Sequence, residues 1–147
     1  MRLLLFTDGG ARGNPGPAGI GFVIQNEKSE VLTDGKKFLG RATNNQAEYQ
    51  AILAGLITTL QLKPTQIDCF LDSELVVKQL NRQYRVKELE LKKLFKQVQL
   101  ILFQNPQLKI TFTHIPRGKN RLADKLVNEA IDEKTRNPNL ETRNKFK

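Results

Sequence analysis

The chain has 147 residues, of which 39% are hydrophobic and 27% are charged, a composition typical of one soluble domain that buries its own core. No apolar run is long enough to span a bilayer, and acid and glycine residues interrupt the apolar start too early for a secretory signal, so we expect a cytoplasmic protein without a membrane partner. The formal net charge of +9 favours a polyanionic partner such as nucleic acid, although a solubilising basic surface would give the same total.

The first half of the chain changes from a strand pattern to a helix pattern. Three apolar runs separated by turn-forming residues predict an antiparallel meander with strands at residues 2–7, 19–24 and 31–39. Apolar residues then recur at spacings of three and four, which predicts an amphipathic helix over residues 45–61. Thr43 or Asn44 is well placed to cap that helix.

The second half of the chain alternates strands with helices. The predicted strands are residues 67–71 and 108–115, and the predicted helices are residues 73–80, 89–102 and 122–131. Beyond Lys134 the chain is polar and shows no apolar period, so we expect a basic, poorly ordered tail at 134–147 after one domain at 1–133. We see no internal repeat, and we expect a monomer.

The order of these elements predicts how they pack. Strands that alternate with helices after a meander are typical of an α/β fold, in which helices cover a mixed sheet. Asp8 and Asp72 each follow an apolar run that we predict to be a strand. A right-handed crossover through the helix at 45–61 makes the fourth strand parallel to the first, which places both acids at one end of the sheet.

Carboxyl groups that converge in this way are candidates for a metal site. They cannot all stay ionised without a compensating charge, because like charges raise each other's pKa. A hard divalent cation with oxygen ligands relieves that repulsion, and magnesium suits phosphate substrates. The candidates are Asp8, Glu48, Asp72 and Asp124.

Each acid taken singly has another interpretation. Asp8 with Gly9 could begin a turn, and Asp72 could be only the cap of the helix that follows it. Glu48, which we place in the first turn of its helix, could be there because the helix dipole favours an anion. Asp124 could be a solvated helix charge.

Four motifs that contain these acids occur in order along the chain. They span residues 7–21, 43–48, 72–77 and 120–126, and the first opens with Thr7-Asp8-Gly9-Gly10. Through these motifs the chain resembles the type 1 ribonucleases H from residue 3 to about residue 130. The resemblance implies an α/β fold with a five-stranded mixed sheet in the order 3-2-1-4-5, flanked by helices.

The resemblance also implies a reaction. Type 1 ribonucleases H are endonucleases that hydrolyse the RNA strand of RNA–DNA hybrids by a two-metal mechanism, leaving 5′-phosphate and 3′-hydroxyl ends. The expected cofactor is Mg²⁺, with Mn²⁺ as the alternative, and double-stranded RNA stays open as a second substrate. A non-catalytic nucleic-acid-binding module on the same scaffold is the rival interpretation, but the mutual repulsion of the acids would serve no purpose in binding.

The family's functional residues fall on matching positions of this chain. The metal-binding carboxylates fall on Asp8, Glu48, Asp72 and Asp124. Contacts to RNA 2′-hydroxyls fall on Gly10, Asn14, Asn44 and Asn45, and the pocket for a DNA phosphate falls on Arg41 and Thr43. An arginine beside a hydroxyl near a helix N-terminus is a suitable phosphate site.

The chain departs from the family pattern in two places. His114 is the only histidine, and we interpret it as a structural residue at the end of the last strand rather than as the family's mobile catalytic histidine. Arg117 then lies nearest the missing histidine, and an arginine can neutralise phosphate but cannot shuttle a proton. The segment 81–90 lacks the tryptophan-rich handle of some members, so Arg82, Arg85 and Lys87 either grip phosphates or form a solvated face.

Overall fold

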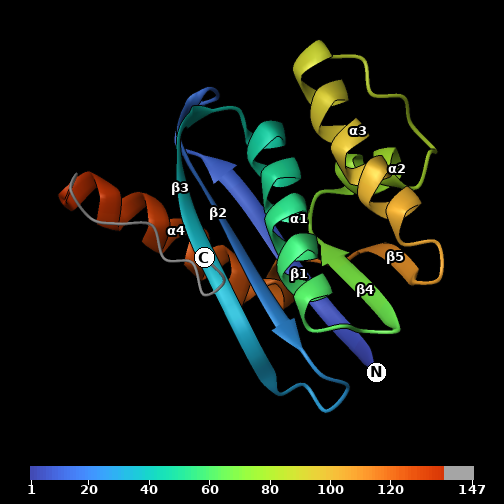
Figure 1. The fold of residues 1–147 in the computed structure, drawn as a ribbon. Helices are drawn as coiled ribbons and strands as arrows, with labels where there is room; N and C mark the ends of the chain where they lie inside the picture. Colours follow the sequence, from blue (N-terminus) through green and yellow to red (C-terminus); the bar gives the residue numbers. More distant parts are fainter. Residues whose placement is uncertain (138–147) are drawn as a thin grey trace.

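The computed structural model describes residues 1–137 as a five-stranded sheet with helices on both faces (Figure 1). The strands are β1 (Arg2–Ala11), β2 (Gly16–Gln25), β3 (Val31–Ala42), β4 (Gln66–Leu71) and β5 (Lys109–His114). The helices are α1 (Asn44–Gln61), α2 (Glu74–Leu80), α3 (Leu89–Gln104) and α4 (Arg121–Arg136), with a short 3-10 helix η1 (Arg117–Lys119) before α4. The predicted succession of strands and helices is confirmed.

The sheet has the order β3-β2-β1-β4-β5, so the predicted fold class and strand order are confirmed. β1 pairs antiparallel with β2 and β2 with β3, whereas β1 and β4, and β4 and β5, pair in parallel. The carboxyl ends of β1, β4 and β5 therefore lie at the same end of the sheet, and the amino end of α1 lies near the carboxyl end of β1 (Figure 1).

β1 continues beyond the strand that the sequence predicts. The prediction ended it at residue 7, but Asp8–Ala11 pair with Ala18–Gly21 of β2. Asp8 therefore lies inside a strand, and its interpretation as the first residue of a turn is wrong. Gly9 lets α1 approach the strand closely, and tertiary packing outweighs the preference of this segment for a turn.

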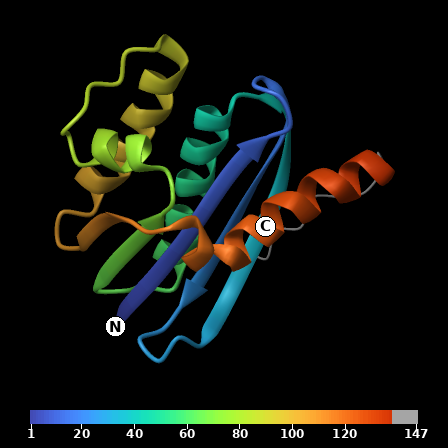
Figure 2. The same cartoon turned by 180° about the vertical axis from the view of Figure 1, so that it is seen from behind.

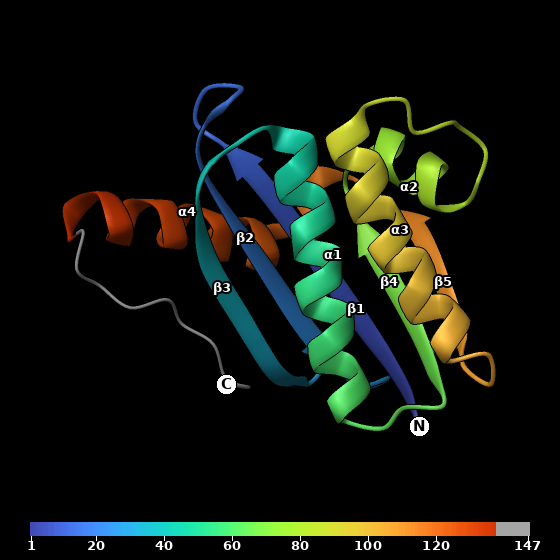
Figure 3. The same ribbon diagram turned by 45° about the horizontal axis from the view of Figure 1, so that its top comes forward.

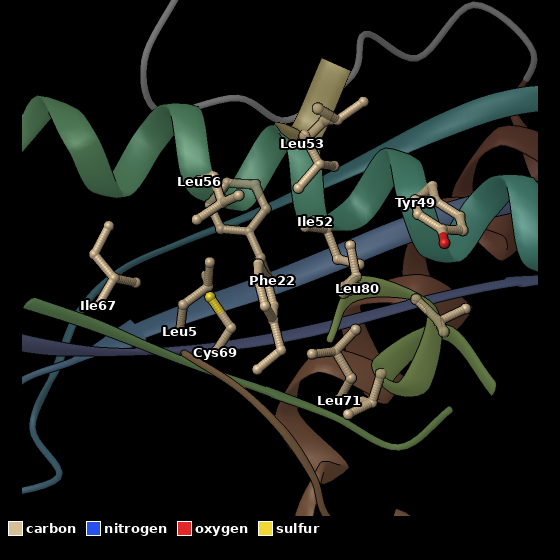
Figure 4. Close-up of a cluster of buried hydrophobic side chains, with 14 of the residues drawn as sticks. Leu5, Phe22, Tyr49, Ile52, Leu53, Leu56, Ile67, Cys69, Leu71 and Leu80 are labelled. Atoms are coloured by element: carbon tan, nitrogen blue, oxygen red, sulfur yellow. The ribbon is translucent and has the colours of Figure 1, made fainter. Parts of the chain in front are cut away.

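The helix α1 covers one face of the sheet and forms the centre of the core. Thr43 caps it: the Thr43 hydroxyl accepts from the backbone N–H of Gln46 at 3.1 Å, and Gln46 Oε1 accepts from the backbone N–H of Thr43 at 2.9 Å. Leu5, Ile52 and Leu56 are fully buried between sheet and helix (Figure 4). The free thiol of Cys69 lies in the same cluster, as expected for a small buried side chain.

The helix α4 crosses the opposite face of the sheet, over β1, β2 and β3 (Figure 2). An ion pair fixes it to β3, because Lys36 Nζ lies 3.2 Å from Glu129 Oε1 and 2.6 Å from Glu133 Oε2. α4 runs to Arg136, so its last residues lie where we predicted the start of a disordered tail. The rest of that prediction falls on 138–147, outside the described residues.

The helices α2 and α3 lie beside α1 on the same face, next to β4 and β5 (Figure 3). Ser73 caps α2, since its hydroxyl accepts from the backbone N–H of Val76 at 3.3 Å. Asp72 is therefore not the cap of this helix. Within the described part of the chain, no helix combines the length and the apolar character needed to cross a membrane.

Candidate active site

Three carboxyl groups meet at the edge of the sheet where β1 and β4 point in the same direction. One carboxylate oxygen from each of Asp8, Glu48 and Asp72 lies within 4.8 Å of the other two. The parallel register accounts for two of them, because Phe6 pairs with Phe70 and the next residues on the same face are Asp8 and Asp72. The sheet thus aligns two acids, and α1 supplies the third.

Gly9 allows α1 to bring Glu48 to this edge. A Cβ atom at Gly9 would lie 2.3 Å from the carbonyl carbon of Ala47, so only glycine permits this approach. The Gly9 backbone N–H donates to Glu48 Oε1 at 3.0 Å. Glu48 lies beyond the first turn of α1, which contains no acid, so the helix dipole is not the reason for its position.

Ionisation of these acids is electrostatically unfavourable, because they are buried close to one another. Burial, the largest cause, and the charges of Asp72 and Asp124 together raise the pKa of Asp8 to about 7. Burial, together with the charge of Asp8, holds the pKa of Glu48 well above its usual range. Glu48 Oε2 is buried and has no hydrogen-bond partner among the described residues. A donor set of hard, partly unpaired oxygens fits a divalent cation.

Asp124 lies at the rim of this group rather than inside it. It sits in the first turn of α4 and lines the same cleft as the other three acids. Its side chain is 33% exposed, and its Oδ1 atom lies 3.7 Å from Arg117 Nη2. Because its charge raises the pKa of Asp8, Asp124 interacts with the buried acids and is more than a solvated helix charge.

The acids line an open cleft of about 440 Å³ together with the loop after β1 and the start of α1. Of the four residues expected to contact the RNA strand, Gly10, Asn44 and Asn45 line the cleft and Asn14 does not. Apart from its two chain neighbours, no described residue has an atom closer than 3.9 Å to where a Gly10 Cβ would be, so packing does not require glycine there. The bare backbone instead leaves room for a ligand.

Two asparagine side chains join the end of β1 and the loop after it to the start of α1. Asn14 Oδ1 accepts from the backbone N–H of Asn44 at 2.9 Å, and Asn44 Oδ1 accepts from the backbone N–H of Ala11 at 2.8 Å. Both carbonyl oxygens are therefore used within the protein. The Nδ2 groups of Asn14 and Asn44 donate to none of the described residues, which leaves them available to a ligand.

Arg41, near the end of β3, and Thr43, the N-cap of α1, lie outside the acid cleft. Arg41 is exposed and lines a separate hollow of about 330 Å³, which it shares with Gln46 and Lys93. The Thr43 hydroxyl oxygen accepts the capping hydrogen bond of α1, and its proton remains free to donate to a ligand.

The basic segment between α2 and α3 divides into two parts. Arg82 is turned towards α3, where its Nη2 group donates to Gln99 Oε1 at 2.8 Å. Arg85 instead lines a groove of about 520 Å³ with Tyr84, Lys87 and Asn45. Asn45 also lines the acid cleft, so the groove and the cleft adjoin.

His114 is the last residue of β5, which confirms its predicted place in the strand. His114 is aligned with Leu71 in the parallel pair of β4 and β5, so the two side chains lie on the same face of the sheet. Leu71 is buried in the core, and Asp72, the next residue, lies on the opposite face. His114 is exposed and does not line the acid cleft, whereas Arg117 does. The exposure shows that His114 contributes little to packing, contrary to our view of it as a structural residue.

Several residues of the site were not assigned a role from the sequence. Asn120 donates to Asp72 and to the Thr7 carbonyl. Arg12 forms an ion pair with Asp132 and donates to Asn128 Oδ1 at 3.3 Å, which ties the loop after β1 to α4. Asn120 could have been noticed because it immediately precedes a helix. No local pattern indicates the long-range partners of Arg12.

Comparison with known proteins agrees with this geometry. Residues 6–130 match the family described as Reverse transcriptase-like. A bifunctional protein of Mycobacterium tuberculosis is 42% identical over 90% of this chain, and the ribonuclease HI of Halobacterium salinarum is 37% identical over 90%. The chain spans only 36% and 65% of the length of these two relatives.

Solved structures extend the comparison to the fold. LC11-RNase H1, solved in complex with an RNA/DNA hybrid, superimposes with a TM-score of 0.85 at 44% identity, covering 90% of this chain and 99% of that one. The RNase H1 of Halobacterium salinarum gives a TM-score of 0.85 at 36% identity, with 90% and 99% covered. The strand order, the cleft of acids and these matches show that the chain belongs to the type 1 ribonuclease H family.

Proposed function

We propose that this protein is a metal-dependent endoribonuclease that hydrolyses the RNA strand of RNA–DNA hybrids. The observation that carries the proposal is the cleft in which Asp8, Glu48 and Asp72 present oxygens within 4.8 Å of one another, with Asp124 at the rim. The names of the relatives, ribonuclease HI and an RNase H1 bound to a hybrid, point to the same activity.

The family and the carboxylate cluster indicate a divalent cation, and we propose Mg²⁺, with Mn²⁺ as the alternative. Asp8, Glu48 and Asp72 would hold it, and Asp124 would help to hold a second ion. When bound, such ions lower the pKa of water and neutralise charge on the attacking and leaving oxygens of a phosphodiester. The products would carry 5′-phosphate and 3′-hydroxyl ends.

Residues around the acids would orient the RNA strand. The Asn14 and Asn44 Nδ2 groups are free to donate, Asn45 lines the cleft, and the Gly10 backbone is open to close approach. A 2′-hydroxyl can both accept and donate hydrogen bonds, which separates RNA from DNA. Arg117, 82% exposed at the rim, would neutralise phosphate charge without moving a proton.

The DNA strand would lie over the start of α1 and the groove beside α2. Arg41, with the Thr43 hydroxyl nearby, supplies a cation and a donor for one phosphate. In the groove, Tyr84 offers a half-exposed ring, and Lys78 Nζ lies 4.9 Å from its centroid. Arg85 and Lys87 add positive charge beside that ring, a combination that suits a nucleic-acid strand. Arg82 does not line this groove, and its guanidinium donates to Gln99.

We further propose that the protein acts as a monomer in the cytoplasm. The monomer is supported by the cleft, in which one chain supplies all the acids and the asparagines around them. Double-stranded RNA presents 2′-hydroxyls in similar positions and is the substrate against which selectivity has to be measured.

The test is a substrate panel of one sequence prepared as RNA–DNA hybrid, RNA duplex and DNA duplex, each incubated with Mg²⁺, Mn²⁺ or chelator. We expect cleavage of the RNA strand of the hybrid with metal, none in chelator, and an intact DNA duplex. Cleavage of the RNA duplex at a comparable rate would widen the substrate class. Binding of the hybrid without cleavage under all metal conditions would instead identify a binding module.

A further inference from the structure

Asn120 is a buried amide that touches three of the elements that carry the acids. It lies between η1 and α4 with 1% of its surface exposed. Its Nδ2 group donates to the backbone carbonyl of Thr7 at 2.8 Å and to Asp72 Oδ2 at 3.0 Å. Its own backbone carbonyl accepts from the N–H of Asp124 at 3.1 Å.

Helix capping does not explain this side chain. Asn120 is the N-cap residue of α4, but its side chain makes no capping hydrogen bond to the helix. Both donors of the amide are instead directed towards β1 and Asp72. An aspartate would cap the helix equally well, but its charge would repel Asp72. The chemical feature that distinguishes asparagine here is therefore the pair of donors.

We propose that Asn120 is a positioning residue that fixes the Asp72 carboxylate and the start of α4 relative to β1, and so sets the spacing of the acids that bind metal. The bond to Oδ2 restricts rotation of the Asp72 carboxyl group. The bond to the Thr7 carbonyl anchors the amide beside Asp8. Asn120 does not itself line the acid cleft, so it acts through Asp72. This inference rests on the metal site of the proposed function.

Removal of the amide should weaken metal binding without weakening hybrid binding. Outer hydrogen-bond partners of metal ligands typically contribute about 10- to 100-fold to metal affinity or activity. We expect Asn120→Ala to bind Mn²⁺ about 10- to 100-fold more weakly in a titration followed by electron paramagnetic resonance without substrate. The kcat for hybrid cleavage should fall by a similar factor while KM for the hybrid stays within about twofold.

Two further variants separate positioning from folding. Asn120→Ser introduces a preferred N-cap residue, which supports the start of α4, but its short side chain cannot bridge Thr7 and Asp72. It should therefore fold and still lose metal affinity. Asn105→Ala is the matched control, because Asn105 Nδ2 donates to the Ile101 carbonyl at 2.8 Å at the end of α3, far from the acids. It should lower the melting temperature and leave Mn²⁺ affinity unchanged.

A double-mutant cycle tests whether Asn120 acts through Asp72. If it does, Asn120→Ala combined with Asp72→Asn should bind Mn²⁺ no more weakly than Asp72→Asn alone. Additive losses, or an Asn120→Ser variant that is folded and has parental Mn²⁺ affinity and kcat, would overturn the proposal. Failure of the parent to cleave hybrids would refute the proposed function, whereas the Mn²⁺ measurements would still decide the role of Asn120.

Discussion

Asp8 and Glu48 are buried carboxyl groups next to each other, and their burial links stability to pH. The folded pKa of Asp8 is about 7, against an ordinary value of 3.8. Between these values the folded state binds more protons than the unfolded state, so the metal-free protein loses stability as pH rises from about 4 to about 7. Metal binding requires the ionised acids, so metal affinity should increase over the same range.

Asp8→Asn removes one of these groups, and its effect on stability should depend on pH. At pH 8 in chelator we expect the free energy of unfolding to rise by about 1–3 kcal/mol, because repulsion and the burial of a charge are both relieved. At pH 4 the gain should vanish. Urea unfolding at the two pH values measures this, with the exposed Glu27→Gln as a control. A gain that is equal at both pH values would contradict the coupling of these acids.

His114→Ala should change neither stability nor catalysis by much. The side chain is exposed, and it lies on the side of the sheet opposite to Asp72. General acid–base groups contribute about a hundredfold or more to rate, so a single-turnover rate within about threefold of the parent is expected. A hundredfold loss with unchanged melting would show that His114 reaches the scissile phosphate through a movement of the chain.

At the residue scale, the sequence predicted the acids far better than the residues that form hydrogen bonds to them. Asp8, Glu48 and Asp72 could be recognised from ordered motifs, and the structure brings them together. Asn120 was part of a motif, yet nothing local shows that its amide bonds to residues far away in the chain. Local patterns record spacing and capping, whereas hydrogen bonds between distant segments depend on the whole fold.

At the element scale, β1 is longer than predicted, because its last residues are of types that are also common in turns. The Asp8-Gly9-Gly10 segment has the composition of a turn, but it continues the strand because Gly9 meets α1 and because it pairs with β2. The actual turn lies at residues 12–15. α1 was predicted closely, and its cap is Thr43, one of the two residues that the sequence offered, because a long amphipathic period and a capping residue are local signals.

The loop between α2 and α3 leads to different expectations for its two arginines. Arg85→Ala should weaken hybrid binding and reduce the slope of log affinity against log salt by about 0.7–0.9, the loss of one phosphate contact. Arg82→Ala should have a smaller effect, because Arg82 is bonded to Gln99. Anisotropy titrations across a salt series, in the Glu48→Gln background, would measure both. Equal slopes for parent and Arg85→Ala would show that the groove is only a solvated face.

Arg41 should contribute more to the binding of an RNA–DNA hybrid than to the binding of an RNA duplex. If Arg41 holds a phosphate of the DNA strand, Arg41→Ala should weaken hybrid binding more than binding to an RNA duplex, because the RNA duplex places its second backbone differently. Lys93→Ala, on the other side of the same hollow, is the control for a general loss of charge. An equal loss of affinity for the hybrid and for the RNA duplex would mean that Arg41 contributes only non-specific attraction.

At the scale of the whole molecule, the sequence predicted the fold class and strand order, but not how α4 lies across the sheet. The alternation of elements predicted the fold class, the right-handed crossover predicted that β4 runs parallel to β1, and the resemblance to the type 1 ribonucleases H implied the order β3-β2-β1-β4-β5, which the structure has. The path of α4 over β2 and β3 depends on Gly19 and Gly21, where a side chain would meet the helix, and on the Lys36 ion pairs. Such side-chain complementarity has no sequence period.

The central claim is that the acids hold divalent metal and cleave RNA paired with DNA. Its most direct test is the single-turnover rate on a hybrid labelled in the RNA strand, for the parent and for Glu48→Gln, across a Mg²⁺ titration and in chelator. We expect parent cleavage with 5′-phosphate products, none in chelator, and a loss of at least about a hundredfold in the variant. Cleavage in chelator, or a folded Glu48→Gln that keeps the parental rate, would contradict the claim.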